Sequence, residues 1–440
     1  MTGPASPHPP APSPSGRRGD SAGQTEHPSP PGRGTEGEGK IARLIYIANI
    51  RLPTEKAHGL QVVQNCEAFA DSGADVSLWA AARQNTPELQ LVSDVWAHYG
   101  VKRNFRLRRL PTLDLMALVS GQDTPLSRLI FRVQAVTFAL AMLIGALFTP
   151  AEVYYSRDAL VIALLSLIKP RRKLGYEAHS KAKGRAGLWL QRRAARNASV
   201  FATTGKLRDE LVAMGAEPGR AHVAHDGVRF DRFASLPARA EARAAFGWPD
   251  DAFIVGYVGR LHTMSMDKGV GLLVDALAGI PGAALALVGG PDDQAEILRC
   301  RWLDLGLPAG RFVYAGQLHP NRVPAALAAL DVAAMPFPWT EHFAWYASPI
   351  KLFEYMAAGC AIVATDLPST AEVVVDGETA LLVPPSDTGA LTEAITRLQA
   401  DPSLRQSLGE AARALVVREY TWGSRAQRIL SALAEASDAR

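Results

Sequence analysis

Short apolar runs alternate with longer amphipathic stretches along most of the chain. The runs are IARLIYIA (41–48), DVSLWAA (75–81), EVYYS (152–156), KLGYEAH (173–179) and SVFAT (199–203), then FIVGYVG (253–259), ALALVGG (284–290), FVYAG (312–316), DVAAMPF (331–337) and AIVAT (361–365). Apolar runs without polar alternation are typical of strands buried on both faces of a parallel sheet, and the intervening segments are long enough for helices. The pattern therefore predicts an α/β protein.

The two sets of runs predict two doubly wound, Rossmann-like domains. The length of 440 residues is enough for two separate cores. We expect a first domain over residues 41–230, a second over 231–420, and a junction in HDGVRFDRFASLP (225–237). The last segment, 421–440, contains an amphipathic pattern that predicts one more helix.

Composition restricts the remaining parts of the chain. Residues 1–40 are rich in Pro, Gly and Ser, which predicts a disordered tail, and they lack the apolar core of a signal peptide. The three cysteines, Cys66, Cys300 and Cys360, are far apart. This spacing argues against a disulfide framework or a clustered zinc site and favours a reducing compartment.

The charge is unevenly distributed between the two halves. Residues 41–230 contain 26 Lys and Arg against 15 Asp and Glu, a net charge of +11, whereas residues 231–440 contain 17 against 24, a net charge of −7. We therefore expect the first half to face an anionic partner.

The loops after the second-half strands contain candidate binding residues. Ligands of doubly wound sheets bind beyond the carboxyl ends of the strands. Glycines there let the backbone approach a ligand, and a helix start presents free N–H groups to an anion. Ser348 is expected to be an N-cap and Pro349 a first helical residue. The candidates are Gly259, Arg260, Lys268, Gly269, Gly289, Gly290, Gly316, Leu318 and the stretch SPIKLFEYMAAG (348–359).

Six motifs resemble those of the retaining glycosyltransferases of family 4, the glycosyl transferases group 1. They are PTEKAHGLQ (53–61), YEAHS (176–180), HDGVRFDRF (225–233), GR with DKG (259–260 and 267–269), SPIKLFEYMAAGCAIVATD (348–366) and AEVVVDGETALLV (371–383). The resemblance covers roughly residues 41–435 and implies the GT-B fold, in which two Rossmann-like domains face each other across a cleft. It also implies a C-terminal helix that crosses back to the first domain.

The resemblance assigns site residues in the second domain. Arg260 and Lys268 would hold the diphosphate of a nucleotide-sugar donor, and Glu354 would bind the donor ribose. Backbone groups of the helix start would meet the diphosphate and the sugar. The further donor-binding candidates are Gly289, Gly290, Leu318, Tyr346, Ser348, Pro349, Ile350 and Lys351.

Two departures from the family pattern bear on the donor sugar. Tyr346 stands where the family often has the first Glu of a Glu-x7-Glu motif, and Glu341 or His342 could replace it or lie in a solvated loop. The loop GRLHTMSMDKG (259–269) is also long, so the assignment of Lys268 requires the extra residues to bulge out.

The first domain would supply the acceptor side. The family places a donor-contacting His at the loop that holds His179, and Gly59 would sit close to the phosphates and the acceptor. Arg157 lies in a similar loop, where Asp158 could equally serve only as a helix cap. The sequence has no Asp-x-Asp motif for a metal, and neither a metal nor a cofactor is expected beyond the donor itself.

The implied activity is retaining transfer of a sugar from a nucleotide-diphosphate sugar to a glycan, lipid-linked or small-molecule acceptor. In the family's usual mechanism the donor phosphate helps to deprotonate the acceptor. Three alternatives remain: a non-catalytic nucleotide-sugar-binding subunit of a polysaccharide assembly complex, a GT-B nucleotide-sugar epimerase, and a phosphorylase of the same fold, which would usually be a much longer chain with a pyridoxal lysine. No nucleic-acid partner is expected.

A strongly apolar stretch in the first half raises the question of membrane contact. LIFRVQAVTFALAMLIGALF (129–148) would interrupt the first sheet if it spanned a bilayer, so we expect no span there. It could instead lie on the bilayer, with KRNFRLRR (102–109) and KPRRK (169–173) on anionic head groups, or be a buried helix. The expected location is cytoplasmic, with peripheral contact at the inner face of the cytoplasmic membrane.

Overall fold

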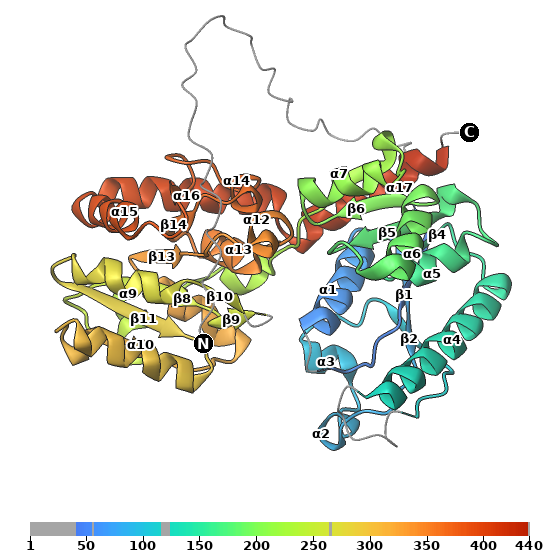
Figure 1. Cartoon of the computed structure of the whole chain (residues 1–440), viewed down its shortest axis with the longest axis horizontal. Helices are drawn as coiled ribbons and strands as arrows, with labels where there is room; N and C mark the ends of the chain where they lie inside the picture. The colour runs from blue at the N-terminus through green and yellow to red at the C-terminus, as the bar shows by residue number, and fades with distance from the viewer. Residues whose placement is uncertain (1–40, 55–56, 116–123, 264–265, 439–440) are drawn as a thin grey trace, which may run out of the picture. The chain divides into compact units, whose positions relative to one another are not determined.

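The computed structural model describes residues 41–54, 57–115, 124–263 and 266–438, and these fold around two parallel β-sheets (Figure 1). The tail predicted over residues 1–40 lies outside the described residues. The first sheet has seven strands in the order β3-β2-β1-β4-β5-β6-β7. They are β1 (Arg43–Ala48), β2 (Asp75–Ala81), β3 (Arg106–Leu110), β4 (Val153–Ser156), β5 (Leu174–Ala178), β6 (Ser199–Ala202) and β7 (Ala221–Val223).

The second sheet repeats the strand order of the first with six strands. Its order is β12-β11-β8-β13-β14-β15, so in both sheets the chain starts in the middle, moves to one edge and then returns to build the other. This is the doubly wound arrangement that the alternating pattern predicted. The strands are β8 (Phe253–Val258), β11 (Ala283–Val288), β12 (Phe312–Tyr314), β13 (Val332–Met335), β14 (Ala361–Thr365) and β15 (Leu381–Val383).

Helices cover both faces of the first sheet. In Figure 1, α1 lies on one side of strands β1 and β2 and α4 on the other. The helices up to the second sheet are α1 (Ala57–Asp71), α2 (Pro87–Gln90), α3 (Val95–Tyr99), α4 (Pro125–Phe148), α5 (Ala159–Leu165), α6 (Gly184–Arg196) and α7 (Gly205–Ala213). The same part of the chain has short 3₁₀ turns at η2 (Arg171–Lys173), η3 (Pro218–Arg220) and η4 (Phe230–Phe233).

The second sheet is covered in the same way, and its central strands are almost completely buried. All six residues of β11 and all five of β14 are buried, which explains why these runs show no polar alternation. The helices are α8 (Arg239–Phe246), α9 (Val270–Ala278), α10 (Asp292–Asp304), α11 (Val323–Ala328), α12 (Glu341–Trp345), α13 (Ile350–Ala357), α14 (Pro368–Ala371), α15 (Thr388–Ala400) and α16 (Pro402–Glu419). A small hairpin, β9 (His262–Thr263) with β10 (Met266–Asp267), follows β8, and 3₁₀ turns lie at η5 (Ala309–Arg311) and η6 (Pro320–Arg322).

The last helix, α17 (Trp422–Asp438), returns to the first sheet. It contacts α1, and its Ile429 and Leu433 are buried in one cluster with Phe69 of α1 and Tyr155 of β4. The predicted crossing of the C-terminal helix is therefore confirmed, and the first core is closed by residues from both ends of the described chain.

The apolar stretch near residue 140 forms α4, which connects β3 to β4 of the same sheet. Among the described residues, α4 is the one helix long and apolar enough to cross a bilayer, and 33% of its most apolar window is buried. It packs on the sheet through Phe138, Met142 and Ala146, and Gln134 bonds Asn49 and Thr112. As a crossover held to the sheet by these contacts, α4 agrees with the expectation that the segment does not span.

Candidate functional site

The glycine loops of the second sheet lie side by side at the carboxyl ends of its strands. The Gly259 N–H after β8 donates to the Val288 carbonyl at 2.8 Å, and the Gly289 N–H after β11 donates to the Gly316 carbonyl at 2.7 Å. Gly289 has φ +117°, and a Cβ there would lie 2.1 Å from the Gly259 oxygen. Only glycine allows this spacing, so the three loops form one continuous floor.

The long loop after Arg260 folds back on itself as the hairpin β9–β10. The Lys268 N–H donates to the Leu261 carbonyl at 3.1 Å, and the Leu261 N–H donates to the Gly290 carbonyl at 3.0 Å. The extra residues are thus taken up in the hairpin, and Lys268 returns to the edge where Arg260 leaves β8. The assignment of Lys268 requires the extra loop residues to bulge out, and the hairpin agrees with this requirement.

Three cations gather at this edge. Burial, followed by the charges of Lys351 and Arg260, lowers the pKa of Lys268 to about 8. Burial and then the charge of Lys268 also lower the pKa of His342. Arg260 is exposed, and Lys268 lies with its Nζ 5.4 Å from the centre of the Phe337 ring. Like charges held this close favour an anion that would neutralise them.

Helix α13 starts one residue later than the sequence predicted. The helix begins at Ile350. Pro349 is its N-cap residue, and its side chain makes no capping hydrogen bond. The Ser348 hydroxyl, predicted to be the N-cap, instead accepts a hydrogen bond from the Asp226 N–H at 2.9 Å. The sequence prediction was wrong because Ser348 binds a distant segment that no local pattern reveals, and α13 is left without a side-chain cap.

Glu354 lies one turn into α13 and is partly buried. Its Oε2 accepts a hydrogen bond from the Lys351 Nζ at 2.8 Å, and 20% of its side chain is exposed. Its other carboxylate oxygen accepts no hydrogen bond from the described residues. Lys351 and Glu354 therefore present a cation and an acceptor side by side.

Tyr346 and Glu341 point to different surroundings. The Tyr346 hydroxyl donates to Glu210 Oε1 of α7 at 3.0 Å, and burial, followed by this bond, raises the pKa of Tyr346 to about 12. Glu341 is exposed. Of the two upstream residues, His342 is thus the one close enough to sense the charge of Lys268.

His179 lies directly after β5 and is held by a buried carboxylate. Its Nε2 lies 2.5 Å from Glu177 Oε1, and the Tyr155 hydroxyl donates to Glu177 Oε2 at 2.6 Å. Burial alone would raise the pKa of Glu177, but the charge of Arg425, the bond and charge of His179 and the charge of Arg157 together lower it well below its ordinary value. The carboxylate is therefore ionised and fixes the orientation of the His179 ring.

Arg425 of α17 completes this buried group. Its side chain is 0% exposed, and its Nη2 lies 3.1 Å from Glu177 Oε2. The Nη1 donates to Asn65 Oδ1 at 2.6 Å, and the Nε donates to the His225 carbonyl at 2.9 Å. Neither Glu177 nor Arg425 was expected from the sequence to belong to the site. A Glu inside the apolar run LGYEA was the available signal, because a buried carboxylate requires a partner.

The remaining first-sheet candidates have structural partners of their own. Arg157 donates from Nη1 to Gln61 Oε1 at 3.1 Å, and its Nε lies 3.6 Å from Glu177. Asp158 caps α5 by accepting from the Leu160 N–H. A Cβ on Gly59 would lie 2.3 Å from Thr54 Cγ2, so the packing at the start of α1 requires glycine there.

Leu318 is half-buried after β12 and packs against the second core. Gly290, next to Gly289, accepts the Leu261 N–H described above. Among the residues that the structure describes, no group of three or more His, Cys, Asp or Glu is arranged to hold a metal ion.

Comparison with known proteins identifies a family and several relatives that match part of the chain. Residues 252–401 match the family described as "Glycosyl transferases group 1". D-inositol 3-phosphate glycosyltransferase of Mycobacteroides abscessus is 31% identical over 234 residues, 52% of this chain and 49% of that protein. GDP-mannose-dependent alpha-(1-6)-phosphatidylinositol monomannoside mannosyltransferase of Mycolicibacterium smegmatis is 32% identical over 220 residues, 49% of this chain and 56% of that protein. The matches thus span about half the length of these curated relatives.

The fold extends over most of the chain. Sucrose-phosphate synthase from Thermosynechococcus elongatus superposes with a TM-score of 0.64 at 23% identity, covering 88% of this chain and 97% of that one. At this identity the superposition shows the fold, which is GT-B with two parallel Rossmann-like sheets. Over residues 252–401, the chain is thus similar to the family of glycosyl transferases group 1.

Proposed function

We propose that the protein is a retaining glycosyltransferase that moves a sugar from a nucleotide-diphosphate sugar to an acceptor. The observation that carries the proposal is the convergence of Arg260, Lys268 and Lys351 beside the uncapped start of α13. A helix start and a group of cations at the carboxyl ends of parallel strands together suit a diphosphate.

The cations would act mainly on the leaving group. As the bond between the sugar and the diphosphate breaks, negative charge grows on the diphosphate, and Arg260 and Lys268 would stabilise it. A dianion beside Lys268 would also raise the pKa of this lysine and keep it protonated. Glu354 would accept from the ribose hydroxyls through its unbonded oxygen while Lys351 holds the carboxylate in place.

The first sheet would face the sugar and the acceptor. His179, oriented by Glu177, would contact the donor, Gly59 would lie near the phosphates and the acceptor, and Arg157 would also contact substrate. The other donor-side positions would be Gly289, Gly290, Leu318, Tyr346, Ser348, Pro349 and Ile350. Retention would follow if a donor phosphate oxygen takes the acceptor proton while the acceptor attacks the same face of the sugar, so that the protein mainly positions the groups.

Turnover of labelled nucleotide sugars tests this proposal. We expect release of free nucleoside diphosphate from one donor of a panel that includes UDP-glucose and GDP-mannose, together with a labelled product whose anomeric configuration is that of the donor. Tyr346 offers a reason to test the non-catalytic alternative, because it replaces a family Glu and is turned to Glu210. Tight donor binding without turnover on any acceptor would favour the binding subunit, and interconversion of the free nucleotide sugar would favour an epimerase.

We also propose peripheral contact with the cytoplasmic face of a membrane, which suits a lipid-linked acceptor. Helix α4 exposes a row of apolar side chains, and one relative by its name acts on a phosphatidylinositol monomannoside. The exposed fractions on α4 include 55% for Leu129, 57% for Val136, 58% for Ile144 and 83% for Phe148. Exposed apolar residues beside arginines are typical of surfaces that lie on anionic bilayers.

Co-sedimentation with liposomes tests the membrane contact. Recovery should rise with the content of anionic lipid and fall as salt screens the charges. Replacement of Arg106, Arg108 and Arg109 by Ser should lower recovery on anionic vesicles. Equal recovery of the parent on neutral and anionic vesicles would contradict the role of the arginines.

A further inference from the structure

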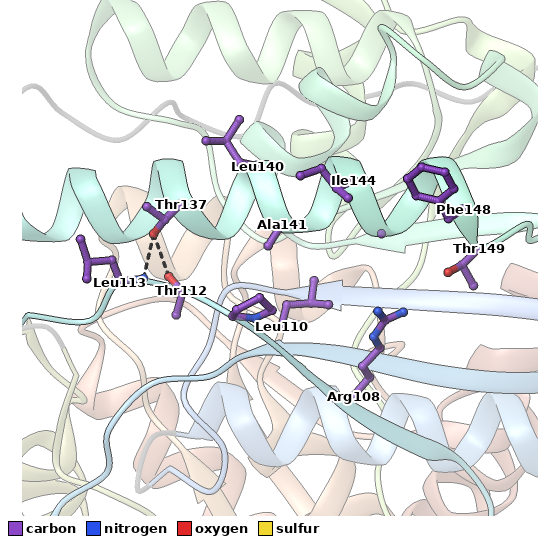
Figure 2. A pocket seen from close by; sticks show the side chains of 12 residues that line it. Arg108, Leu110, Thr112, Leu113, Thr137, Leu140, Ala141, Ile144, Phe148 and Thr149 are labelled. Atoms are coloured by element: carbon purple, nitrogen blue, oxygen red, sulfur yellow. Dashed lines mark hydrogen bonds between the residues drawn. The ribbon is translucent and has the colours of Figure 1, made fainter.

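Helix α4 and the strand before it enclose an apolar groove. The groove has a volume of about 630 Å³, within the range of about 300–1,000 Å³ that is usual for small-ligand sites. Figure 2 shows Leu140, Ala141, Ile144 and Phe148 along α4 on one side, and Leu110 and Leu113 of β3 and the segment after it on the other. Thr112 and Leu113 both bond the Thr137 hydroxyl, which joins the two walls at one end.

A second hollow adjoins the other end of the groove. It also measures about 630 Å³, and it shares Arg108 and Thr149 with the groove. Four arginines line it: Arg43, Arg103, Arg106 and Arg108. They come from β1, β3 and the segment before β3, where the side chains of Ser77 and Trp79 of β2 form the floor.

Most of these arginines have no acidic partner. Arg106 donates to both oxygens of Asp75, but Arg103 and Arg108 lie over the rings of Trp96 and Trp79, 4.6 and 5.1 Å from the ring centres. Within the described chain, Arg43, Arg103 and Arg108 pair with no carboxylate, and the buried Nε of Arg43 has no hydrogen-bond partner. The guanidinium groups of Arg43, Arg103 and Arg108 can therefore pair with an anion in the hollow that they line.

We propose that these two hollows form one site for a membrane lipid, with its anionic phosphate at the arginines and one hydrocarbon chain along the groove of α4. The combination is complementary to an amphiphile: Arg43, Arg103 and Arg108 supply charge, and the adjoining groove supplies apolar surface that is otherwise in water. Phe148, 83% exposed, and Ile144, 58% exposed, are the side chains that the hydrocarbon would cover.

The lipid site is distinct from the donor site. Its arginines lie toward the amino ends of β1 and β3, whereas His179 follows the carboxyl end of β5 in the same sheet, and the sheet is parallel. The site would anchor the protein to the bilayer through one bound lipid and would not itself hold the reacting acceptor. The inference rests on the proposed membrane contact and is independent of the transfer chemistry.

Calorimetry with a single-chain probe tests the site in the full-length protein. We expect n-decyl phosphate, below its critical micelle concentration, to bind at least about tenfold more tightly than either inorganic phosphate or the neutral n-decyl maltoside, because only the first fills both hollows. Equal affinity for decyl phosphate and decyl maltoside would show that the arginines do not bind the phosphate. Equal affinity for decyl phosphate and inorganic phosphate would show that the groove does not bind the hydrocarbon chain.

Matched variants on one helix locate the chain of the probe. Ile144 and Leu147 of α4 are both 58% exposed, but only Ile144 lines the groove. Ile144→Gln should weaken decyl phosphate binding at least about threefold, and Leu147→Gln should leave it unchanged. Equal effects of the two variants would overturn the assignment of the groove.

Matched arginine variants locate the phosphate. Arg108→Ser should weaken decyl phosphate about tenfold, whereas Arg132→Ser, at an exposed position of α4 outside both hollows, should not. Vesicles with phosphatidic acid should show the same order of variants. A parent protein that sediments as a dimer, and as a monomer after Ile144→Gln, would identify a second copy as the occupant of the groove and overturn the proposal. Loss of turnover in the parent would leave these binding results unaffected.

Discussion

Single side chains at the proposed donor edge, the group of Arg260, Lys268, Lys351 and Glu354, are governed by electrostatics more than by local pattern. Lys268 is the clearest case: burial and two neighbouring cations hold its pKa at about 8, far below that of an exposed lysine. Glu354 is the counterpart, a carboxylate held by Lys351 at 2.8 Å. Both residues could be named from the sequence, but the neighbours that surround them are supplied only by the fold.

Removal of Lys268 should slow transfer more than it weakens donor binding. Lys268→Ala should lower kcat by roughly 10²–10³, the scale for loss of one preorganised electrostatic contact to developing charge. Arg260→Lys should also be impaired, because an ammonium cannot make a bidentate guanidinium contact. Steady-state kinetics measures both effects, and a folded Lys268→Ala, Arg260→Lys double variant with near-parent kcat would contradict the assignment.

The lowered pKa of Lys268 should make nucleoside diphosphate affinity dependent on pH. In the protein without ligand, Lys268 has a pKa of about 8, so it is charged below pH 8 and loses its proton above pH 8. Nucleoside diphosphate should therefore bind tightly at pH 7, and its affinity should weaken as the pH rises through 8. Calorimetry between pH 6.5 and 9.5 measures the change. In Lys268→Arg the guanidinium stays charged, so the weakening near pH 8 should disappear, and its persistence there would point to another group.

Glu354 should distinguish the nucleoside from the diphosphate. In Glu354→Gln, a charge-assisted bond to the ribose becomes a neutral one, so nucleoside diphosphate affinity should fall by about 1–3 kcal/mol. Because Lys351 loses its carboxylate partner, inorganic pyrophosphate should bind as well as before or better. Parallel calorimetry with both ligands checks this, and an equal loss for both would mean that Glu354 acts only through the local fold.

At the scale of elements, glycine loops and helix ends position the site. The floor made by the loops after β8, β11 and β12 depends on backbone approaches that no other residue permits. Helix α17 supplies Arg425 to a carboxylate on β5, about 250 residues earlier in the chain, and so joins the last helix to the ring of His179.

Addition of one methyl group should disrupt the glycine floor. A Cβ at Gly289 would meet the Gly259 oxygen at 2.1 Å in a backbone conformation with φ +117°, so Gly289→Ala should displace the loop that leads to Arg260 and weaken donor binding. Gly310→Ala is the matched control, because no atom lies within 4 Å of a Cβ there. Comparable donor affinity in the two variants would mean that the loop accommodates the change.

Arg425 should be required for the stability of the first core. Arg425→Ala leaves the buried Glu177 without its main counter-charge, a loss that typically costs about 3–5 kcal/mol. Chemical denaturation followed by circular dichroism measures the loss. The single variants Arg425→Met and Glu177→Gln are compared with the double variant that combines them. The double variant should lose less stability than the sum of the losses in the two single variants, and simple additivity would show that the pair is not coupled.

The same pair gives a pH dependence of stability. The folded-state pKa of Glu177 is lowered, so its contribution is present above the ordinary pKa of a glutamate and is lost as the pH falls through the folded-state value. The parent should therefore lose stability in acid more steeply than Glu177→Gln. Identical acid profiles would remove Glu177 as a source of the loss.

At the scale of the whole molecule, two sheets with the same winding contribute different chemistry. The second sheet brings together cations, glycines and a helix start, and the first brings an oriented histidine and, on α4, an apolar surface next to arginines. The uneven charge of the two halves is consistent with this division, since the basic half contains the arginine-lined hollow.

The sequence by itself determined the fold class and named the residues that we propose to bind the donor. Apolar runs buried on both faces of a parallel sheet must be continuous, so they are visible without a structure, and Arg260, Lys268 and Glu354 stand in local motifs tied to those strands. Tertiary structure alone decided the rest. In the folded chain, Ser348 accepts a hydrogen bond from Asp226 and does not cap a helix. Tyr346 donates to Glu210, and Arg425 pairs with Glu177. These contacts link residues far apart in the chain, and their free energy depends on burial and distance, which exist only after the chain has folded.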